Sequence, residues 1–206
     1  IRDRFTRDSS SNCRFFLNGT QIGSTHSNSA NVAQSGVTRI GAGVHAVEAF
    51  TGYIKDVRIL KGTALYTSNF TAPTENLTAI TNTNLLTCHL PYIVDGSTTG
   101  HTITVNGDPS TKPFGPFDHE TYSVAANSGS MSLDGTTDRI SAAASTDFGF
   151  GTADLTIEYW IYLNSISNYP CGFDMRSADN DTPLSVFIQT GSSNQQGVWV
   201  SNATIA

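Results

Sequence analysis

Apolar and polar residues alternate in short runs along the whole chain. Clusters of Gly, Asn, Asp and Ser bound these runs, and no stretch of ten or more residues repeats its apolar positions at helical spacing. Residues 13–17 (CRFFL) lead into Asn18-Gly19 and then into residues 21–24. Because Asn-Gly accepts the positive φ angles of a type I′ turn, this pattern predicts a β-hairpin. The chain as a whole is expected to consist of strands.

Further strands are expected at residues 37–40, 50–60, 85–90, 101–105, 130–133, 139–141, 154–163, 183–189 and 198–200. Within residues 50–60 the spacing of apolar positions shifts from three to two, which predicts a β-bulge. Residues 154–163 (DLTIEYWIYL) are almost continuously apolar, which predicts a central strand covered on both faces by a second sheet or an interface. Residues 63–70 are expected to form a single helical or 3₁₀ turn.

The composition favours an all-β chain. Charged residues make up only 14% of the 206 residues, against roughly 25% in typical soluble domains. Ser, Thr, Asn and Gly take their place. These short side chains satisfy turn backbones locally, whereas Lys and Glu favour helices. The length suits one large β-sandwich or two small domains.

The charge balance excludes some partners. A formal net charge of -6 leaves no basic surface to hold a phosphate backbone, so no nucleic acid is expected. No run of about 18 apolar residues is present to span a bilayer, so no membrane insertion is expected. The chain starts at Ile1 without Met, and we interpret this start as that of a fragment or processed product. Cys13, Cys88 and Cys171 are odd in number and far apart, which predicts inert, unpaired thiols.

The second half of the chain carries an ordered set of motifs. A strand that ends in the Asp134-Gly135 turn is followed by FGFGTAD, residues 148–154, and then by IEYW, residues 157–160. This order resembles the opening of a laminin-G-like, concanavalin A-like jelly roll, as repeated in marine-phage structural proteins. Residues 5–74 resemble the end of such a domain, and residues 84–110 resemble its first strand and loop. The resemblance implies an all-β, antiparallel jelly-roll β-sandwich.

The order of these motifs divides the chain. Residues 1–75 are expected to be the C-terminal half of one sandwich, residues 76–82 a connector, and residues 83–206 the N-terminal part of a second sandwich. Neither half is long enough to bury an adequate core alone. The halves are therefore expected to pair with each other as a permuted sandwich, or with halves of neighbouring chains.

The pattern of carboxylates predicts no catalytic residue and no enzyme. Glycoside hydrolases with this fold need two carboxylates on one strand, whereas Glu158 stands alone between Thr156 and Trp160 at the alternate positions. We interpret Glu158 as a structural carboxylate. Asp134 and Asp138 flank a turn whose oxygen atoms could hold calcium, but Asp before Gly is also the ordinary residue of a tight turn. The turn is the favoured interpretation, so no cofactor is expected, and calcium is the one metal left open.

Sugar binding would use an exposed aromatic ring beside amide or carboxylate side chains, in loops at one end of the sandwich. The candidate residues are Tyr169, Asn180 and Trp199. Edge packing or an interface is the alternative explanation for each of them.

Together with the resemblance, these features predict a noncatalytic structural or adhesion module of the virion surface, such as a tail or head fibre or a capsid decoration. Its expected partners are other copies of itself or other virion proteins, with host cell-surface glycan as a further ligand. The alternative is a secreted, extracellular bacterial adhesin with a lectin-like domain.

Overall fold

The computed structural model describes residues 2–33, 36–45, 48–117, 128–165, 170–177, 185–189, 195–200 and 203–204. Its strands are β1 (Arg2–Arg7), β2 (Asn12–Leu17), β3 (Thr20–Ser27), β4 (Thr38–Ile40), β5 (Thr51–Lys61), β6 (Thr83–Thr87), β7 (Ile103–Asn106), β8 (Ser110–Lys112), β9 (Ser130–Asp134), β10 (Arg139–Ala142), β11 (Leu155–Leu163), β12 (Cys171–Asp174), β13 (Ser185–Gln189), β14 (Gln195–Val200) and β15 (Ala203–Thr204). A short 3₁₀ helix spans Thr146–Phe148. Among the described residues, no helix is long and apolar enough to cross a membrane.

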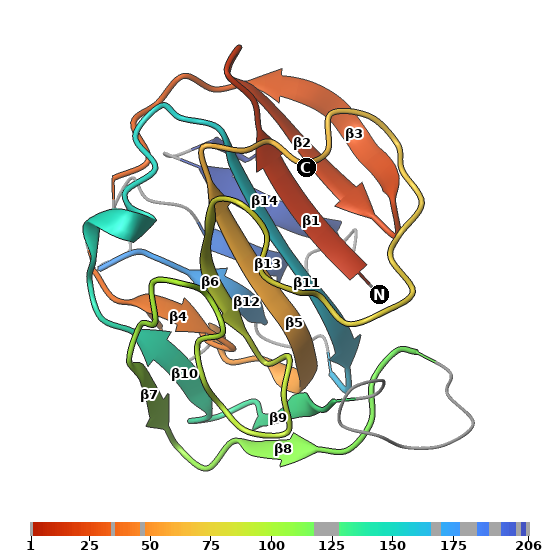
Figure 1. The fold of residues 1–206 in the computed structure, drawn as a ribbon, viewed down its shortest axis with the longest axis vertical. Coiled ribbons are helices and arrows are strands. Elements are labelled where there is room, and N and C mark those ends of the chain that lie inside the picture. The colour runs from red at the N-terminus through yellow and green to blue at the C-terminus, as the bar shows by residue number, and fades with distance from the viewer. Residues whose placement is uncertain are drawn as a thin grey trace.

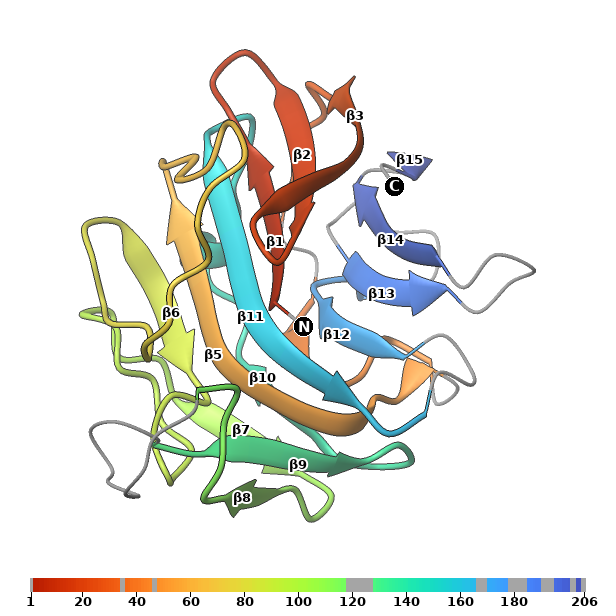
Figure 2. The ribbon, with the colours of Figure 1, turned by 90° about the vertical axis from the view of Figure 1, so that its right-hand side faces the viewer.

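The strands form two antiparallel sheets. The large sheet has the order β3-β2-β1-β11-β5-β9-β8, and β6 also pairs with β5. The small sheet has the order β15-β14-β13-β12-β4-β10-β7. Figure 2 shows β5 and β11 curving along the length of the large sheet, with β12, β13 and β14 beside them. The expected all-β jelly-roll sandwich is confirmed, and β11 lies in the middle of its sheet.

Strand register sorts the side chains of the large sheet onto two faces. One row across the sheet is apolar and buried in the core between the sheets: Phe15, Phe5, Ile157, Ile59 and Leu85. The next row lies on the outer face: Phe16, Arg4, Glu158, Arg58 and Leu86. Because side chains alternate along a strand, a shift of one residue would bring the charged row into the core. Burial of the apolar row therefore fixes the register.

β5 contains the bulge that its apolar spacing predicts. The register with β11 shifts between the pair Arg58–Glu158 and the pair Lys55–Trp160, and Asp56 adopts a positive φ of 55°. β5 pairs with β9 before this point and with β6 after it. The extra residue bends the strand, which allows its two ends to join different neighbours.

Residues 62–82, here called the strap, cross the outer face of the large sheet (Figure 1). The Thr6 hydroxyl donates to the carbonyl of Tyr66, and the backbone amide of Leu65 donates to Thr156 Oγ1. The helical turn expected at residues 63–70 is wrong, since the structure has no helix there. Backbone groups of the strap bond to side chains of β1 and β11 instead of to one another.

Residues 1–75 and 83–206 contribute strands to both sheets. In the large sheet β1 and β5 from the first segment flank β11 from the second. In the small sheet β4 from the first segment lies between β10 and β12 from the second. The two segments thus share both sheets within this one chain. Their assignment to successive repeats of a longer protein stays a prediction.

Candidate functional site

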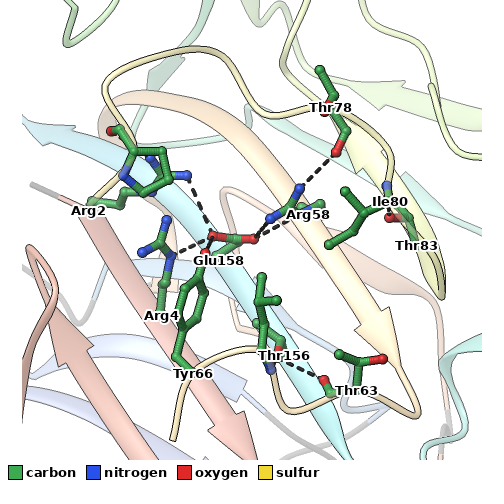
Figure 3. Close-up of polar contacts among 12 residues, drawn as sticks. Arg2, Arg4, Arg58, Thr63, Tyr66, Thr78, Ile80, Thr83, Thr156 and Glu158 are labelled. Carbon is green, nitrogen blue, oxygen red and sulfur yellow. Dashed lines mark hydrogen bonds and ion pairs between the residues drawn. The ribbon is translucent and has the colours of Figure 1, made fainter. Parts of the chain in front are cut away.

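Glu158 lies in a buried charge cluster between the large sheet and the strap (Figure 3). Arg4 Nε and Arg58 Nε donate to its two carboxylate oxygens, the second at 2.7 Å. Arg2 Nη2 lies 3.5 Å from Glu158 Oε2, and the hydroxyl of Tyr66 donates to the same oxygen at 3.4 Å. The strand register accounts for this meeting, because Arg4 and Arg58 stand opposite Glu158 on the neighbouring strands.

Aromatic rings of the strap cover the cluster. The rings of Tyr66 and Phe70 stack with 3.9 Å between their centroids. The Arg4 guanidinium lies 4.2 Å from the Tyr66 centroid and 4.3 Å from the Phe70 centroid. Phe16 packs edge-on against Phe70 at 5.4 Å. These cation–π and aromatic contacts hold the first part of the strap over β1 and β2.

Backbone carbonyls of the strap hold the remaining guanidinium groups. Arg58 Nη1 donates to the carbonyl of Thr78 at 2.8 Å, and Arg2 Nη1 donates to that of Pro73 at 3.1 Å. Both carbonyls belong to the part of the strap that returns toward β6. The cluster therefore fastens the whole strap to the sheet.

The charges of this cluster are removed from solvent. The side chains of Arg2, Arg4 and Glu158 have no exposed surface. Burial lowers the pKa of Arg2 to about 10 and also lowers the pKa of Arg4, while the Glu158 carboxylate opposes both changes. A catalytic carboxylate must reach its substrate. Glu158 instead acts as the counter-charge of three arginines in a closed structure.

The strap covers only part of the outer face of the large sheet. The uncovered part of that face contains an aromatic groove of about 270 Å³. The register places Tyr162 of β11 opposite Tyr53 of β5, with 6.1 Å between their ring centroids. Phe114, from the loop after β8, packs edge-on against Tyr53 at 4.7 Å. Trp160 is two residues before Tyr162 on β11, on the same face of the sheet, and it also lines the groove. The groove is therefore built by two central strands and one loop.

The groove exposes rings and buries polar atoms. Tyr162 is 64% exposed and Phe114 is 44% exposed. Ser130 Oγ and Trp160 Nε1 are buried without a hydrogen-bond partner in the described part of the chain. Buried hydroxyl and indole N–H groups normally have partners. The exposed rings are therefore the part of the groove that a ligand with an apolar face would contact.

Lys55 forms part of the groove wall without offering a charge to a ligand. Its ammonium group is buried, donates to the Gly129 carbonyl at 3.2 Å and contacts Ser128 Oγ. Burial lowers the pKa of Lys55, and the neighbouring Asp56 opposes this change. Burial likewise raises the pKa of Asp56 to about 6, against the opposing effect of Lys55. The groove therefore suits a neutral ligand.

The two calcium candidates order a turn. The backbone amides of Thr136, Thr137 and Asp138 donate to Asp134 Oδ1. The Thr136 hydroxyl, followed by these amides, lowers the pKa of Asp134 to about 2. Asp138 accepts from the amides of Asp108, at 2.6 Å, and Asp134, at 3.1 Å. Among the described residues, no group of three or more His, Cys, Asp or Glu side chains is arranged to hold a metal.

Of the three sugar-binding candidates from the sequence, the structure describes only Trp199, and its strand belongs to the other sheet from the groove. Tyr169 and Asn180 lie outside the described residues. Trp199 lies on β14 of the small sheet, opposite Ser185. Sequence reasoning missed Tyr53, Phe114 and Tyr162, because their proximity depends on the pairing of strands far apart in the chain. One signal was present in the sequence. Tyr53 and Tyr162 each stand at an outer-face position of a strand whose core-facing positions are apolar, which marks them as aromatic residues outside the core.

Comparison with known proteins gives one match, to part of the chain. Residues 5–67 match the family described as the concanavalin A-like lectin/glucanases superfamily. No curated protein and no solved structure matches the chain. The matched residues span β1 to β5 and the start of the strap. The match agrees with the sandwich fold and indicates a carbohydrate-binding or adhesion module.

Proposed function

We propose that this chain is a noncatalytic glycan-binding module of a virion surface, and that the aromatic groove is its binding site. The observation that carries the proposal is the group of aromatic rings, Tyr53, Tyr162 and Phe114, that lines an open groove on the large sheet. Sugar rings have an apolar C–H face and peripheral hydroxyl groups. The groove offers aromatic surface to the apolar face, and the exposed phenol of Tyr162 can bond to a hydroxyl group.

The virion assignment has separate support from the sequence. The order of motifs along the chain resembles tandem repeats in phage structural proteins, and the chain is rich in Ser, Thr, Asn and Gly and poor in charge. A repeated sandwich of this kind would form a fibre or a capsid decoration and would present one groove per repeat. Its partners would be further copies of itself or other virion proteins.

Affinity electrophoresis tests the groove. The chain is run in native gels that contain a soluble neutral polysaccharide, using laminarin, mannan and the host's purified surface polysaccharide as probes. Tyr162→Ala removes an exposed ring. A ring that loses about 60 Å² of apolar surface to the ligand contributes about 1.5 kcal/mol, so the dissociation constant should rise about tenfold. Tyr92→Ala is the control, because Tyr92 is 59% exposed and does not line the groove.

The outcomes separate the parts of the proposal. Retardation by a polysaccharide that Tyr162→Ala weakens and Tyr92→Ala preserves supports the glycan site. Failure of every probe to retard the wild-type chain, or equal effects of the two substitutions, contradicts it. Mass spectrometry of purified virions tests the location. Binding to host polysaccharide without the chain being present in virions would favour a secreted lectin-like adhesin.

A further inference from the structure

A second pocket, of about 320 Å³, lies on the small sheet. It is lined by Arg39 of β4 and Arg139 of β10, together with His45, Thr136 and Thr137. The volume falls at the lower end of the range of small-molecule sites, which is roughly 300–1,000 Å³. The chemistry of its lining differs from that of the aromatic groove, since two guanidinium groups take the place of the rings.

The strand register places the two arginines on the same face. Ile40 and Ile140 are opposed in the β4–β10 pair, and both are buried in the core. The preceding residues, Arg39 and Arg139, therefore point away from the core. Arg39 is opposite Ser141, two residues along β10 from Arg139. Like charges in such diagonal positions repel each other and favour a counter-ion between them.

Neither arginine has a carboxylate partner within 4.0 Å in the described part of the chain. Arg39 Nη1 donates to the carbonyl of Arg176 at 2.7 Å, and Arg139 Nη2 donates to Asn106 Oδ1 at 3.4 Å. A guanidinium group has five N–H donors. Each arginine therefore keeps donors for a ligand.

Glu48 and Asp174 are already paired with Arg176. Arg176 Nη2 lies 2.7 Å from Glu48 Oε2 and 2.9 Å from Asp174 Oδ2. Burial raises the pKa of Asp174, and its bonds with Arg176 oppose this change. Asp134 and Asp138 accept hydrogen bonds within the turn that carries Thr136 and Thr137, and in the described part of the chain neither forms an ion pair with Arg39 or Arg139. Thr136 directs its hydroxyl to Asp134, while the hydroxyl of Thr137 forms no hydrogen bond with another residue in the described part of the chain.

We propose that this pocket binds the carboxylate or sulfate group of an acidic glycan. Both arginines line the pocket and keep N–H donors of the kind that bind such an oxyanion, and the Thr137 hydroxyl adds a further donor. This inference rests on the proposed function in one respect, that the molecule bearing the acidic group is a glycan. The binding of the acidic group itself is independent, because the pocket lies on the other sheet from the aromatic groove. A chain with both sites would recognise a polysaccharide that combines neutral and acidic units.

Isothermal titration calorimetry of the intact chain provides the test. The probes are a hexagalacturonate, a sulfated galactan hexasaccharide, a neutral maltohexaose and inorganic sulfate. Arg39→Gln with Arg139→Gln should lower affinity for at least one acidic probe at least tenfold, and added salt should weaken the same wild-type binding. Arg14→Gln is the control for each of the two substitutions, since it removes one positive charge from β2, where Arg14 pairs with Asp8. Thermal unfolding of each variant verifies that it is folded.

Loss of acidic-probe binding in the double variant, with Arg14→Gln unaffected, supports the proposal. Equal losses for the double variant and Arg14→Gln would show a general charge effect and overturn it, as would the absence of binding to both acidic probes. If inorganic sulfate binds as tightly as the hexasaccharides, the pocket recognises a free anion, and the proposal of a glycan ligand is wrong. Tyr162→Ala leaves acidic-probe affinity unchanged if the two sites are independent. A failure of the groove is therefore distinguishable from a failure of this pocket.

Discussion

Glu158→Gln removes one charge and preserves the size of the side chain. Glu158 is within 4.0 Å of guanidinium nitrogens of Arg2, Arg4 and Arg58. In the described part of the chain none of the three has another carboxylate at that distance. The substitution therefore leaves three buried guanidinium groups without a counter-charge.

The expected loss of stability is large. Removal of one partner of a buried ion pair costs roughly 3–5 kcal/mol, because the other charge stays desolvated. The free energy of unfolding of a whole domain is only roughly 5–15 kcal/mol. At about 2–4 °C per kcal/mol for a chain of this size, the melting temperature should fall by about 6–20 °C. The lowered pKa of Arg2 and of Arg4 has the same cause, since burial already disfavours their charged forms.

Urea unfolding followed by tryptophan fluorescence measures this loss, with Glu75→Gln as the control. Glu75 lies on the strap and is exposed, so its substitution should change the free energy of unfolding by less than about 0.5 kcal/mol. Arg4→Met in the Glu158→Gln background should cost less than Arg4→Met in the wild type, because it removes an uncompensated charge. If Glu158→Gln and Glu75→Gln have equal effects, the cluster does not fasten the strap and the reasoning is refuted.

Asp56→Asn should flatten the pH dependence of stability between about pH 4 and 6. Burial raises the pKa of Asp56 from 3.8 to about 6. The unfolded chain therefore releases this proton first, and stability falls by about 3 kcal/mol as the pH rises through that window; parallel urea-unfolding curves for wild type and variant would contradict this. Calcium should not change the melting temperature, because backbone amides occupy the carboxylates of Asp134 and Asp138. A rise of more than about 3 °C from EDTA to excess calcium chloride would contradict that expectation.

Features with local determinants are predictable from the sequence. Asn18 and Gly19 adopt φ angles of 51° and 87°, as the type I′ hairpin between β2 and β3 requires. The bulge in β5 is visible as a change of apolar spacing, and the three cysteines are free and buried as expected. The short strands β8 and β12 are not predictable in this way. β8 (STK) contains no apolar residue, and β12 (CGFD) has a glycine between its two apolar residues, so neither shows the pattern that identifies the equally short β4 and β10.

The strap shows why the rest could not be predicted. Its sequence is polar and contains Pro73, which is typical of a connector between domains. Its structure depends on Arg2 and Arg58, whose side chains donate to carbonyls of the strap from strands distant in the sequence. A window of local sequence contains only one side of such contacts. The cover over the large sheet is therefore a property of the assembled fold.

The extent of that cover decides which face of β11 is available for binding. The prediction that both faces of residues 154–163 are covered is confirmed for Leu155–Tyr159 and wrong at Tyr162, which is 64% exposed. Glu158 and Tyr162 are outer-face residues of one strand, yet the strap buries the first and leaves the second open. Stability and binding should therefore be separable on this strand. Glu158→Gln should lower the melting temperature while the folded protein keeps its glycan affinity, whereas Tyr162→Ala should lower that affinity at an unchanged melting temperature. If both substitutions reduce both quantities in parallel, the groove and the strap form one unit.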